Sequence, residues 1–264
     1  MRKSIITLLT DFGTKDHYVA SMKGAILNIN PKCILVDITH HVKPHDIEEG
    51  AFILCNAYSF FPKGTIHLCV IDPGVGGPRK PILVVTSNYF FVGPDNGLFT
   101  LVLQREKVKQ VVSLTNQVFF LSQVSTTFHG RDLFAPVVGH LSLGVKPNAF
   151  GKEVHSWMKL IFRKPWVEGK QLIGEVLHID AFGNLISNID KERLLHFVKD
   201  HPFIVRTGKR IIRGLRKGYW DGKKDEPMVL LGSGGFLEIS VREGSAQKIL
   251  KVKRGDNIIV QITN

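Results

Sequence analysis

Three short, almost continuously apolar runs lie in the first third of the chain, and segments with helical periodicity separate them. The runs are Ile5–Leu9, Ile34–Ile38 and Ile66–Ile71. Strands that are apolar without alternation are typical of a parallel sheet covered on both faces. The order strand, helix, strand, helix, strand therefore predicts a parallel α/β sheet with right-handed crossovers and three buried strands.

The two intervening segments carry signals for where their helices begin and end. In the first, Asp16 stands where a capping residue is expected, and Pro31 follows the last apolar position. In the second, Asp46 and Glu49 have capping-box spacing, with Asp in place of the usual Ser or Thr, and Pro62 follows. Both segments are expected to be helices.

The rest of the first half predicts two more features. The runs Ile82–Thr86 and Tyr89–Val92, joined by Ser87 and Asn88, have the pattern of a β-hairpin. The stretch "RDLFAPVVGHLSLG", which begins at Arg131, predicts a last helix before the pattern changes.

The second half has an all-β pattern. Beyond Gly169, short β-rich runs alternate with glycine-containing turns, and one helix is expected over Lys191–Val198. We predict an α/β domain with a mostly parallel sheet over residues 1–150 and a linker over 151–168. A smaller all-β, barrel-like domain is predicted over residues 169–264.

Nothing in the sequence suggests a membrane or a secreted protein. No run approaches the ~18 apolar residues that a membrane span requires, and the apolar run at the N-terminus ends at Asp11 without a cleavage site. The three cysteines, Cys33, Cys55 and Cys69, form no C-x-x-C pair, so we expect reduced thiols. A cytoplasmic protein without a membrane partner is predicted.

The formal net charge is +12, and much of the excess lies in one segment, Arg206–Lys224, whose only acid is Asp221. Such a segment is either a solvated face or a surface that binds phosphate groups. No zinc-finger spacing or aromatic RNA-binding motif accompanies it. Nucleic acid is therefore not the expected main partner, although a non-enzymatic protein that binds nucleic acid or another anion remains an alternative.

Polar side chains follow each of the three predicted parallel strands. Asp11 follows the first strand, the stretch "THHVKPHD" follows the second, and Asp72 follows the third. Ligands bind beyond the carboxyl ends of strands in such sheets. Any one of these acids can also be a turn or helix cap, but three such strand ends at one edge predict a binding site.

The loop "VIDPGVGGPRKP" places Asp72 and Arg79 at the two ends of a glycine-rich stretch. Glycines let a backbone approach a ligand closely, because they carry no side chain. A second polar cluster, "TTFHGRDLFAP", contains Asp132, which is expected to cap the following helix, and His129, which is either a structural histidine or part of a site. A third, "VGPDNGLFT", is expected to be a turn and helix cap.

Common catalytic motifs are absent. "GVGG" is not a dinucleotide fingerprint, no P-loop is present, and "GSGG" around Ser233 is not a nucleophile elbow. His41 and His45 are four residues apart, but Pro44 lies between them in a predicted loop, so no zinc site is expected.

Seven blocks of the chain, in order, resemble one known family. They are "LLTDFGTKDHYVASMKG", "DITHHVKPHDIEEGAFIL", "FFPKGTIHLCVIDPGVGG", "VGPDNGLFT", "FHGRDLFAP", "HIDAFGNLISNI" and "LGSGGFLEIS". Together these blocks resemble the S-adenosyl-L-methionine hydroxide adenosyltransferases, the hydrolytic relatives of the fluorinases and chlorinases. The similarity runs through nearly the whole chain.

The resemblance implies a fold, an assembly and a reaction. The family has an N-terminal α/β domain and a C-terminal β-barrel domain. Its members form homotrimers, with substrate held between the N-terminal domain of one chain and the C-terminal domain of its neighbour. They hydrolyse S-adenosyl-L-methionine to adenosine and L-methionine without a metal or other cofactor.

The resemblance also implies site residues. The Asp, Arg and His triad of the hydrolytic branch matches Asp72, Arg79 and His129, and the ribose-binding acid matches Asp11. Asn184, helped by Asp180, is implied to hold the methionine end or the ribose, and Ser233 matches a serine that contacts the methionine end. The backbone near Val241 is expected to face adenine, and Glu238 on the same strand is a further candidate. Independently of the family, the phenylalanines expected to wall an apolar pocket, or else to belong to the core, are Phe12, Phe128 and Phe182.

One departure and one alternative accompany the resemblance. The halogenases carry a tryptophan in the loop where this chain has His45, so the packing around the sugar or methionine is expected to differ. The triad favours hydrolysis, because the halogenase branch lacks it. Halide-dependent adenosyl transfer is the alternative reaction.

Overall fold

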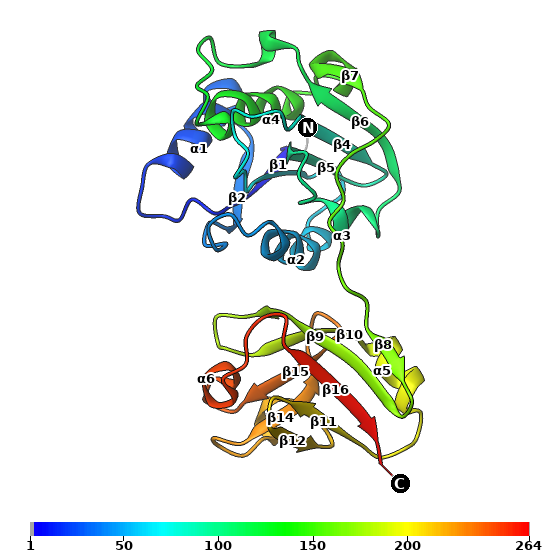
Figure 1. The fold of residues 1–264 in the computed structure, drawn as a ribbon. Coiled ribbons are helices and arrows are strands. Elements are labelled where there is room, and N and C mark those ends of the chain that lie inside the picture. Colours follow the sequence, from blue (N-terminus) through cyan, green and yellow to red (C-terminus); the bar gives the residue numbers. More distant parts are fainter. Residues whose placement is uncertain (1–2, 264) are drawn as a thin grey trace. The chain divides into compact units, whose positions relative to one another are not determined.

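The computed structural model describes residues 3–263, which divide into two compact units (Figure 1). The first unit ends at Ile161 and the second begins at Phe162. The division falls inside the segment 151–168 that we predicted as a linker. The ends of that segment are strands, which the sequence did not suggest: β7 (Gly151–Glu153) pairs with the sheet of the first unit, and β8 (Trp166–Glu168) with that of the second.

The first unit is built on one seven-stranded sheet in the order β2-β1-β3-β5-β4-β6-β7. The remaining strands are β1 (Ile5–Thr10), β2 (Ile34–Thr39), β3 (Ile66–Val70), β4 (Pro81–Thr86), β5 (Phe90–Pro94) and β6 (Val108–Leu114). The first four in that order are parallel, and β4, β6 and β7 join as antiparallel neighbours. The predicted mostly parallel sheet and the hairpin of β4 and β5 are both confirmed.

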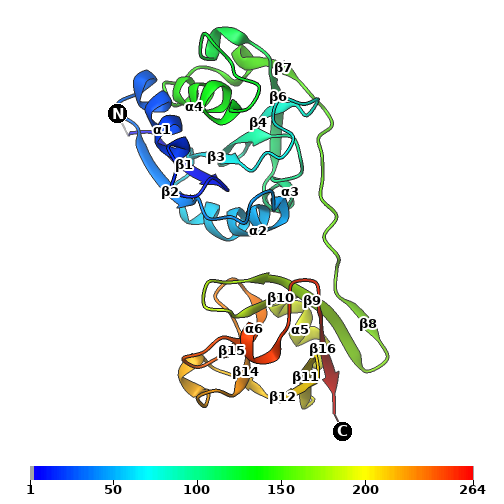
Figure 2. The same cartoon turned by 60° about the vertical axis from the view of Figure 1, so that its left-hand side comes forward.

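Helices cover both faces of this sheet. The helices are α1 (Tyr18–Ile29), α2 (Ile47–Ala57), α3 (Thr100–Leu103) and α4 (Ala135–Ser142). Helices α1 and α4 pack together on one face, and α2 lies on the other (Figures 1 and 2). The core beneath α1 and α4 includes Met22, Ile26 and Val138 packed against Ile6 and Leu68 of the strands.

Two local predictions about this unit are wrong, and one is confirmed. Strand β2 lies at the edge of the sheet and is partly exposed, so it is not buried on both faces. Asp16 does not cap α1, because the residue that precedes the helix is His17, which makes no side-chain cap hydrogen bond. The Asp46 cap of α2 is present: its Oδ1 accepts a hydrogen bond from the Glu49 backbone N–H at 3.0 Å.

The second unit is a single sheet that curls into a nearly closed barrel. Its strands follow the order β12-β11-β16-β9-β10-β15-β14-β13, and β12 and β14 come into contact. They are β9 (Gln171–Ile179), β10 (Leu185–Asp190), β11 (Phe203–Thr207), β12 (Arg210–Arg213), β13 (Leu215–Arg216), β14 (Pro227–Leu231), β15 (Phe236–Val241) and β16 (Asn257–Ile262). The predicted barrel-like fold is confirmed, as is helix α5 with the predicted bounds, Lys191–Val198.

Two further sequence predictions can be compared with the structure. Over residues 3–263, no helix combines the length and apolar character needed to cross a membrane. The three cysteines are free, as predicted, with Cys55 and Cys69 buried and Cys33 partly exposed.

Candidate active site

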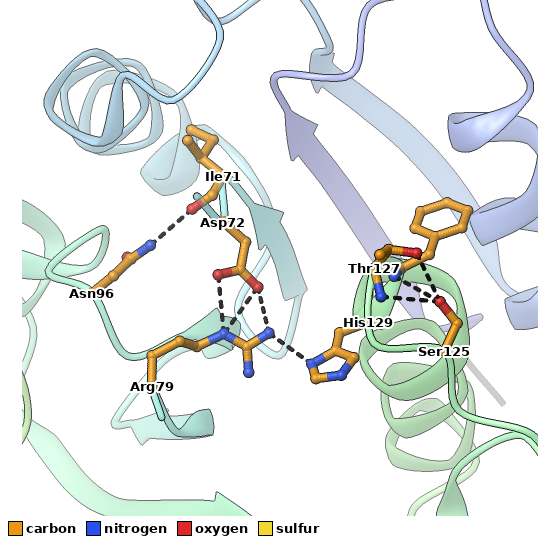
Figure 3. A network of polar contacts seen from close by, with 8 residues as sticks. Ile71, Asp72, Arg79, Asn96, Ser125, Thr127 and His129 are labelled. Carbon is orange, nitrogen blue, oxygen red and sulfur yellow. Dashed lines mark hydrogen bonds and ion pairs between the residues drawn. The ribbon is translucent and has the colours of Figure 1, made fainter. Parts of the chain in front are cut away.

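The loop between β3 and β4 holds a buried ion pair. Arg79 Nε donates to both carboxylate oxygens of Asp72 at 3.0 Å, and its Nη2 also donates to Oδ2 (Figure 3). The side chains of Asp72 and Arg79 are only 5% and 10% exposed. Because the guanidinium and carboxylate planes meet edge to edge, each group fixes the orientation of the other.

Glycine and asparagine shape this loop. Gly76 has a φ of +75°, and a Cβ there would lie 2.3 Å from the Thr126 carbonyl oxygen, so the loop runs directly against the 125–127 segment. Asn96, after β5, donates from Nδ2 to the Ile71 carbonyl at 2.8 Å and braces the backbone beside Asp72 (Figure 3). The sequence indicated a turn around Asn96 but not this contact.

His129 joins the pair from a distant part of the chain. Nη2 of Arg79 lies 2.8 Å from His129 Nδ1 (Figure 3). A guanidinium has no acceptor, so Nδ1 carries the lone pair, and the ring is neutral with its proton on Nε2. Burial lowers the pKa of His129, and the Arg79 cation lowers it further, against smaller opposing effects of Asp72 and Asp132.

The segment after His129 is a π-helical turn, Gly130–Phe134, that leads into α4. Such turns often occur at functional sites. Asp132 is fully buried and does not cap α4, so that prediction is wrong. Its carboxylate instead accepts hydrogen bonds from the Ser125 backbone N–H at 2.8 Å and from Arg131, which fixes the loop before His129.

An aromatic cluster adjoins His129. The Phe12 and Phe128 rings meet edge to face at 5.8 Å, and Tyr18 lies 5.2 Å from Phe128. Gly130 lets them approach, since a Cβ there would lie 3.2 Å from Phe128 and 3.4 Å from Phe12. The two predicted phenylalanines thus lie together, and Tyr18 is an addition that the sequence did not single out.

Asp11 lies at the same edge of the sheet as Asp72. It follows β1, Asp72 follows β3, and Thr10 of β1 pairs in parallel with Val70 of β3. Asp11 Oδ2 accepts a hydrogen bond from the His45 backbone N–H at 2.8 Å, and His45 has a φ of +68°. The loop that carries His45 therefore holds this acid in place.

A relay of polar side chains, buried at His40 and Thr10 and exposed at Asp37, supports the turn that carries Asp11. His40 Nε2 lies 3.0 Å from Asp37, and His40 Nδ1 lies 2.8 Å from the Thr10 hydroxyl. The same hydroxyl accepts the Phe12 backbone N–H at 3.3 Å. Within the histidine-rich stretch after β2, the buried His40 therefore supports the backbone beside Asp11 and does not itself face the solvent at the candidate site.

The remaining candidates lie in the second unit. Asn184 is buried, and its Nδ2 donates to Asp180 Oδ2 at 2.9 Å, while Asp180 Oδ1 accepts backbone N–H groups of the same turn. Phe182, at the tip of this turn, is 78% exposed. An exposed phenylalanine on a tightly braced turn belongs to no core within this unit.

Strand β15 carries two more candidates, and the turn before it a third. Glu238 is buried, and its Oε1 accepts hydrogen bonds from the hydroxyls of Tyr219 at 2.8 Å and Ser240 at 2.6 Å. Burial raises the pKa of Tyr219, and the Glu238 bond raises it further. Val241 is buried at the strand end, whereas Ser233 is exposed in the β14–β15 turn.

Arg79 therefore contacts both Asp72 and His129 in the first unit. The Asp180 and Glu238 clusters belong to the second unit. Within residues 3–263, no group of three or more His, Cys, Asp or Glu side chains is arranged to hold a metal ion.

Comparisons with known proteins match this chain to one enzyme family and its relatives. Residues 6–151 match the family profile of the SAM hydroxide adenosyltransferase N-terminal domain, and residues 174–259 match that of its C-terminal domain. A protein from Methanocaldococcus jannaschii named (R)-S-adenosyl-L-methionine hydrolase is 38% identical over 96% of this chain and 94% of its own length.

Two further relatives extend the comparison. A crystal structure of an uncharacterized conserved protein from Thermotoga maritima is 39% identical, with a TM-score of 0.91 over 97% of this chain and 99% of that one. A fluorinase from Actinoplanes sp. is more distant, at 29% identity over 72% of this chain and 73% of its own. The chain belongs to the SAM hydroxide adenosyltransferase family.

Proposed function

We propose that this protein hydrolyses S-adenosyl-L-methionine to adenosine and L-methionine. The observation that carries the proposal is the convergence of Asp72, Arg79 and His129, which are far apart in sequence, beside an aromatic cluster at the carboxyl edge of the sheet. The hydrolase named above, which matches over nearly the full length, supports the same reaction.

The reaction is an in-line displacement at the ribose 5′ carbon. The oxygen of water forms a bond to this carbon, the carbon–sulfur bond breaks, and its electron pair goes to sulfur. The leaving group is a neutral thioether, so it needs no general acid. The difficulty lies with the nucleophile, because free water has a pKa of about 15.7.

The three side chains address this difficulty. Asp72 orients the water and accepts its proton, and Arg79 stabilises the developing hydroxide. Arg79 Nη1 has no protein partner among the described residues, so it remains available as a donor to the water. His129, neutral and accepting at Nδ1, holds the guanidinium in place.

The aromatic cluster of Phe12, Tyr18 and Phe128 favours a step in which opposite charges neutralise each other. A sulfonium cation meets an anionic nucleophile, and both charges fade in the transition state. Phe12, Tyr18 and Phe128 exclude water from the reacting groups, and aromatic faces attract a cation such as sulfonium. We also propose Phe182, which is exposed at the tip of its turn, as an apolar contact for the substrate.

Substrate contacts complete the proposal. Asp11 binds the ribose hydroxyls, Asn184 with Asp180 binds the methionine end or the ribose, and Ser233 binds the methionine end. The backbone near Val241 faces adenine, and Glu238 supports that strand end.

We also propose a cytoplasmic homotrimer in which the N-terminal unit of one chain and the C-terminal unit of its neighbour share each substrate. No metal or other cofactor takes part in the proposed step.

A product assay with matched variants tests the reaction. Purified protein is incubated with S-adenosyl-L-methionine and a chelator, and adenosine is measured by chromatography. We expect Asp72→Asn to slow adenosine release by about 10²–10⁴-fold, the usual contribution of a general base. Arg79→Lys keeps the charge but loses the paired geometry, and is expected to slow release as well.

The control is Asp200→Asn, which removes one exposed carboxylate elsewhere and is expected to leave the rate unchanged. Equal rates in wild type and Asp72→Asn would contradict the proposed role of the triad. Added fluoride or chloride tests the alternative, and formation of a halogenated nucleoside in place of adenosine would replace hydrolysis with halide transfer.

A further inference from the structure

The proposed reaction leaves the basic segment of the second unit unused. It forms β12, β13 and the turn before β14, and its exposed cations are Lys209, Arg210, Arg213, Arg216, Lys217, Lys223 and Lys224. Among the residues that the structure describes, Lys223 alone in this set has an ion-pair partner, Glu226 at 3.9 Å. The proposed reaction assigns no role to these cations.

Some of these cations surround one surface hollow. The hollow has a volume of about 230 Å³, and its lining includes Arg213 of β12, Arg216 of β13, Lys223 and Glu226. Ile211, which is 54% exposed, lies at the same hollow on the outer face of β12. Cations from three separate elements thus converge, with one acid, on a space that suits a phosphate group.

An exposed aromatic residue lies close in sequence to the lining of this hollow. Trp220 is 71% exposed and lies two residues before Gly222, which lines the hollow. Its short helical turn is anchored by the bond from the Tyr219 hydroxyl to the buried Glu238. The turn also packs closely at Gly222, where a Cβ would lie 2.4 Å from the Met228 sulfur. Trp220 is therefore presented on a fixed support.

We propose that this face, the basic hollow with Trp220, binds single-stranded nucleic acid. Cations that follow a phosphate backbone and an exposed aromatic ring that stacks on an unpaired base are the two elements of such sites. A duplex fits less well, because its bases are already stacked and this face offers no helix for a major groove. An anionic lipid surface fits less well too, since the face has no amphipathic helix to insert.

Fluorescence anisotropy with the full-length protein tests the proposal. The probe is a labelled oligouridylate of about 20 nucleotides, long enough to span one such site. We expect binding that weakens as salt rises from roughly 50 to 200 mM, because released counterions drive it.

Two variants separate the phosphate and stacking contributions. Arg213→Gln with Arg216→Gln is expected to reduce the slope of log Kd against log salt by about 1.4, since each phosphate contact on a single strand contributes about 0.7. Trp220→Ala is expected to weaken binding at least about 5-fold through lost stacking. Both variants should release adenosine at the wild-type rate, which makes this test independent of the hydrolase proposal.

The matched control is Lys32→Gln with Lys63→Gln, which removes the same charge from exposed positions of the first unit. It should leave the salt slope unchanged. An equal loss in the control would overturn the proposal, because it would show that total charge alone attracts the probe. So would unchanged affinity in Trp220→Ala, or binding to phosphatidylserine vesicles without binding to the oligouridylate.

Discussion

The bond from Arg79 to His129 makes the proposed site depend on a neutral imidazole. Nδ1 accepts from Arg79 only while it is unprotonated, and a protonated ring would place a second cation against the guanidinium. Burial and Arg79 both lower the pKa of His129 from its ordinary value near 6.5. The neutral form of His129 therefore predominates at pH 6.5, and half-protonation of the ring lies at a lower pH.

This arrangement predicts the acid side of the pH–rate profile. The midpoint of the acid-side decline in hydrolysis should lie below pH 6.5, because protonation of His129 breaks the bond to Arg79. In His129→Asn, whose amide oxygen accepts a hydrogen bond without titrating, this decline should shift or disappear. Initial adenosine release between about pH 8 and pH 4 measures both profiles, a range that spans the ordinary histidine pKa. A midpoint above 6.5, or identical profiles in the two proteins, would contradict the assignment.

At the residue scale, the sequence identified candidates but not their contacts. Asp72 and Asp11 could be chosen because acids that follow adjacent parallel strands meet at one edge. The residues around His129 did not distinguish a structural histidine from a site residue. The family resemblance indicated that it belongs to the site. The Asn96 brace, the Tyr18 ring and the His40 relay were not predicted, because each depends on a side-chain direction that only tertiary packing determines.

At the scale of elements, the β3–β4 loop depends on one backbone conformation. Gly76 combines a positive φ with close contact to the Thr126 carbonyl. We predict that Gly76→Ala destabilises the protein by roughly 1–3 kcal/mol and lowers hydrolysis, because the loop that carries Asp72 and Arg79 must shift.

The matched variant is Gly64→Ala, at a φ of +88° with no atom within 4 Å of a Cβ. It carries the backbone strain without the clash, so it should lose less stability and keep the wild-type rate. Urea unfolding midpoints and adenosine release measure both. An effect of Gly76→Ala no larger than that of Gly64→Ala would show that the close approach to Thr126 is unimportant.

Elements were predictable where apolar periodicity was strong. Strands β1 and β3 and helix α5 matched their predictions, and the buried His67 of β3 stays neutral, because burial lowers its pKa to about 3. Strands β12 and β13 were not expected from the sequence, because β12 reads Arg-Ile-Ile-Arg without apolar–polar alternation and β13 has only two residues. The exposure of β2 was missed because an edge position is a property of the sheet, not of the strand.

At the scale of the whole molecule, the family resemblance implies a homotrimer. Multi-angle light scattering on the purified protein is predicted to give a mass of about 89 kDa, three times the 29.6 kDa of the chain. Trimers are expected because each proposed substrate site takes residues from two neighbouring chains. A monomer with full hydrolase activity would contradict that part of the proposal.

The central claim is that water bound at Asp72, Arg79 and His129 attacks the ribose 5′ carbon. Hydrolysis in ¹⁸O-labelled water, followed by mass spectrometry of both products, tests it most directly. We expect the label to enter the 5′ hydroxyl of adenosine, methionine to remain unlabelled, and Asp72→Asn to slow the labelling together with adenosine release. Unlabelled adenosine, or 5′-methylthioadenosine as the nucleoside product, would contradict it.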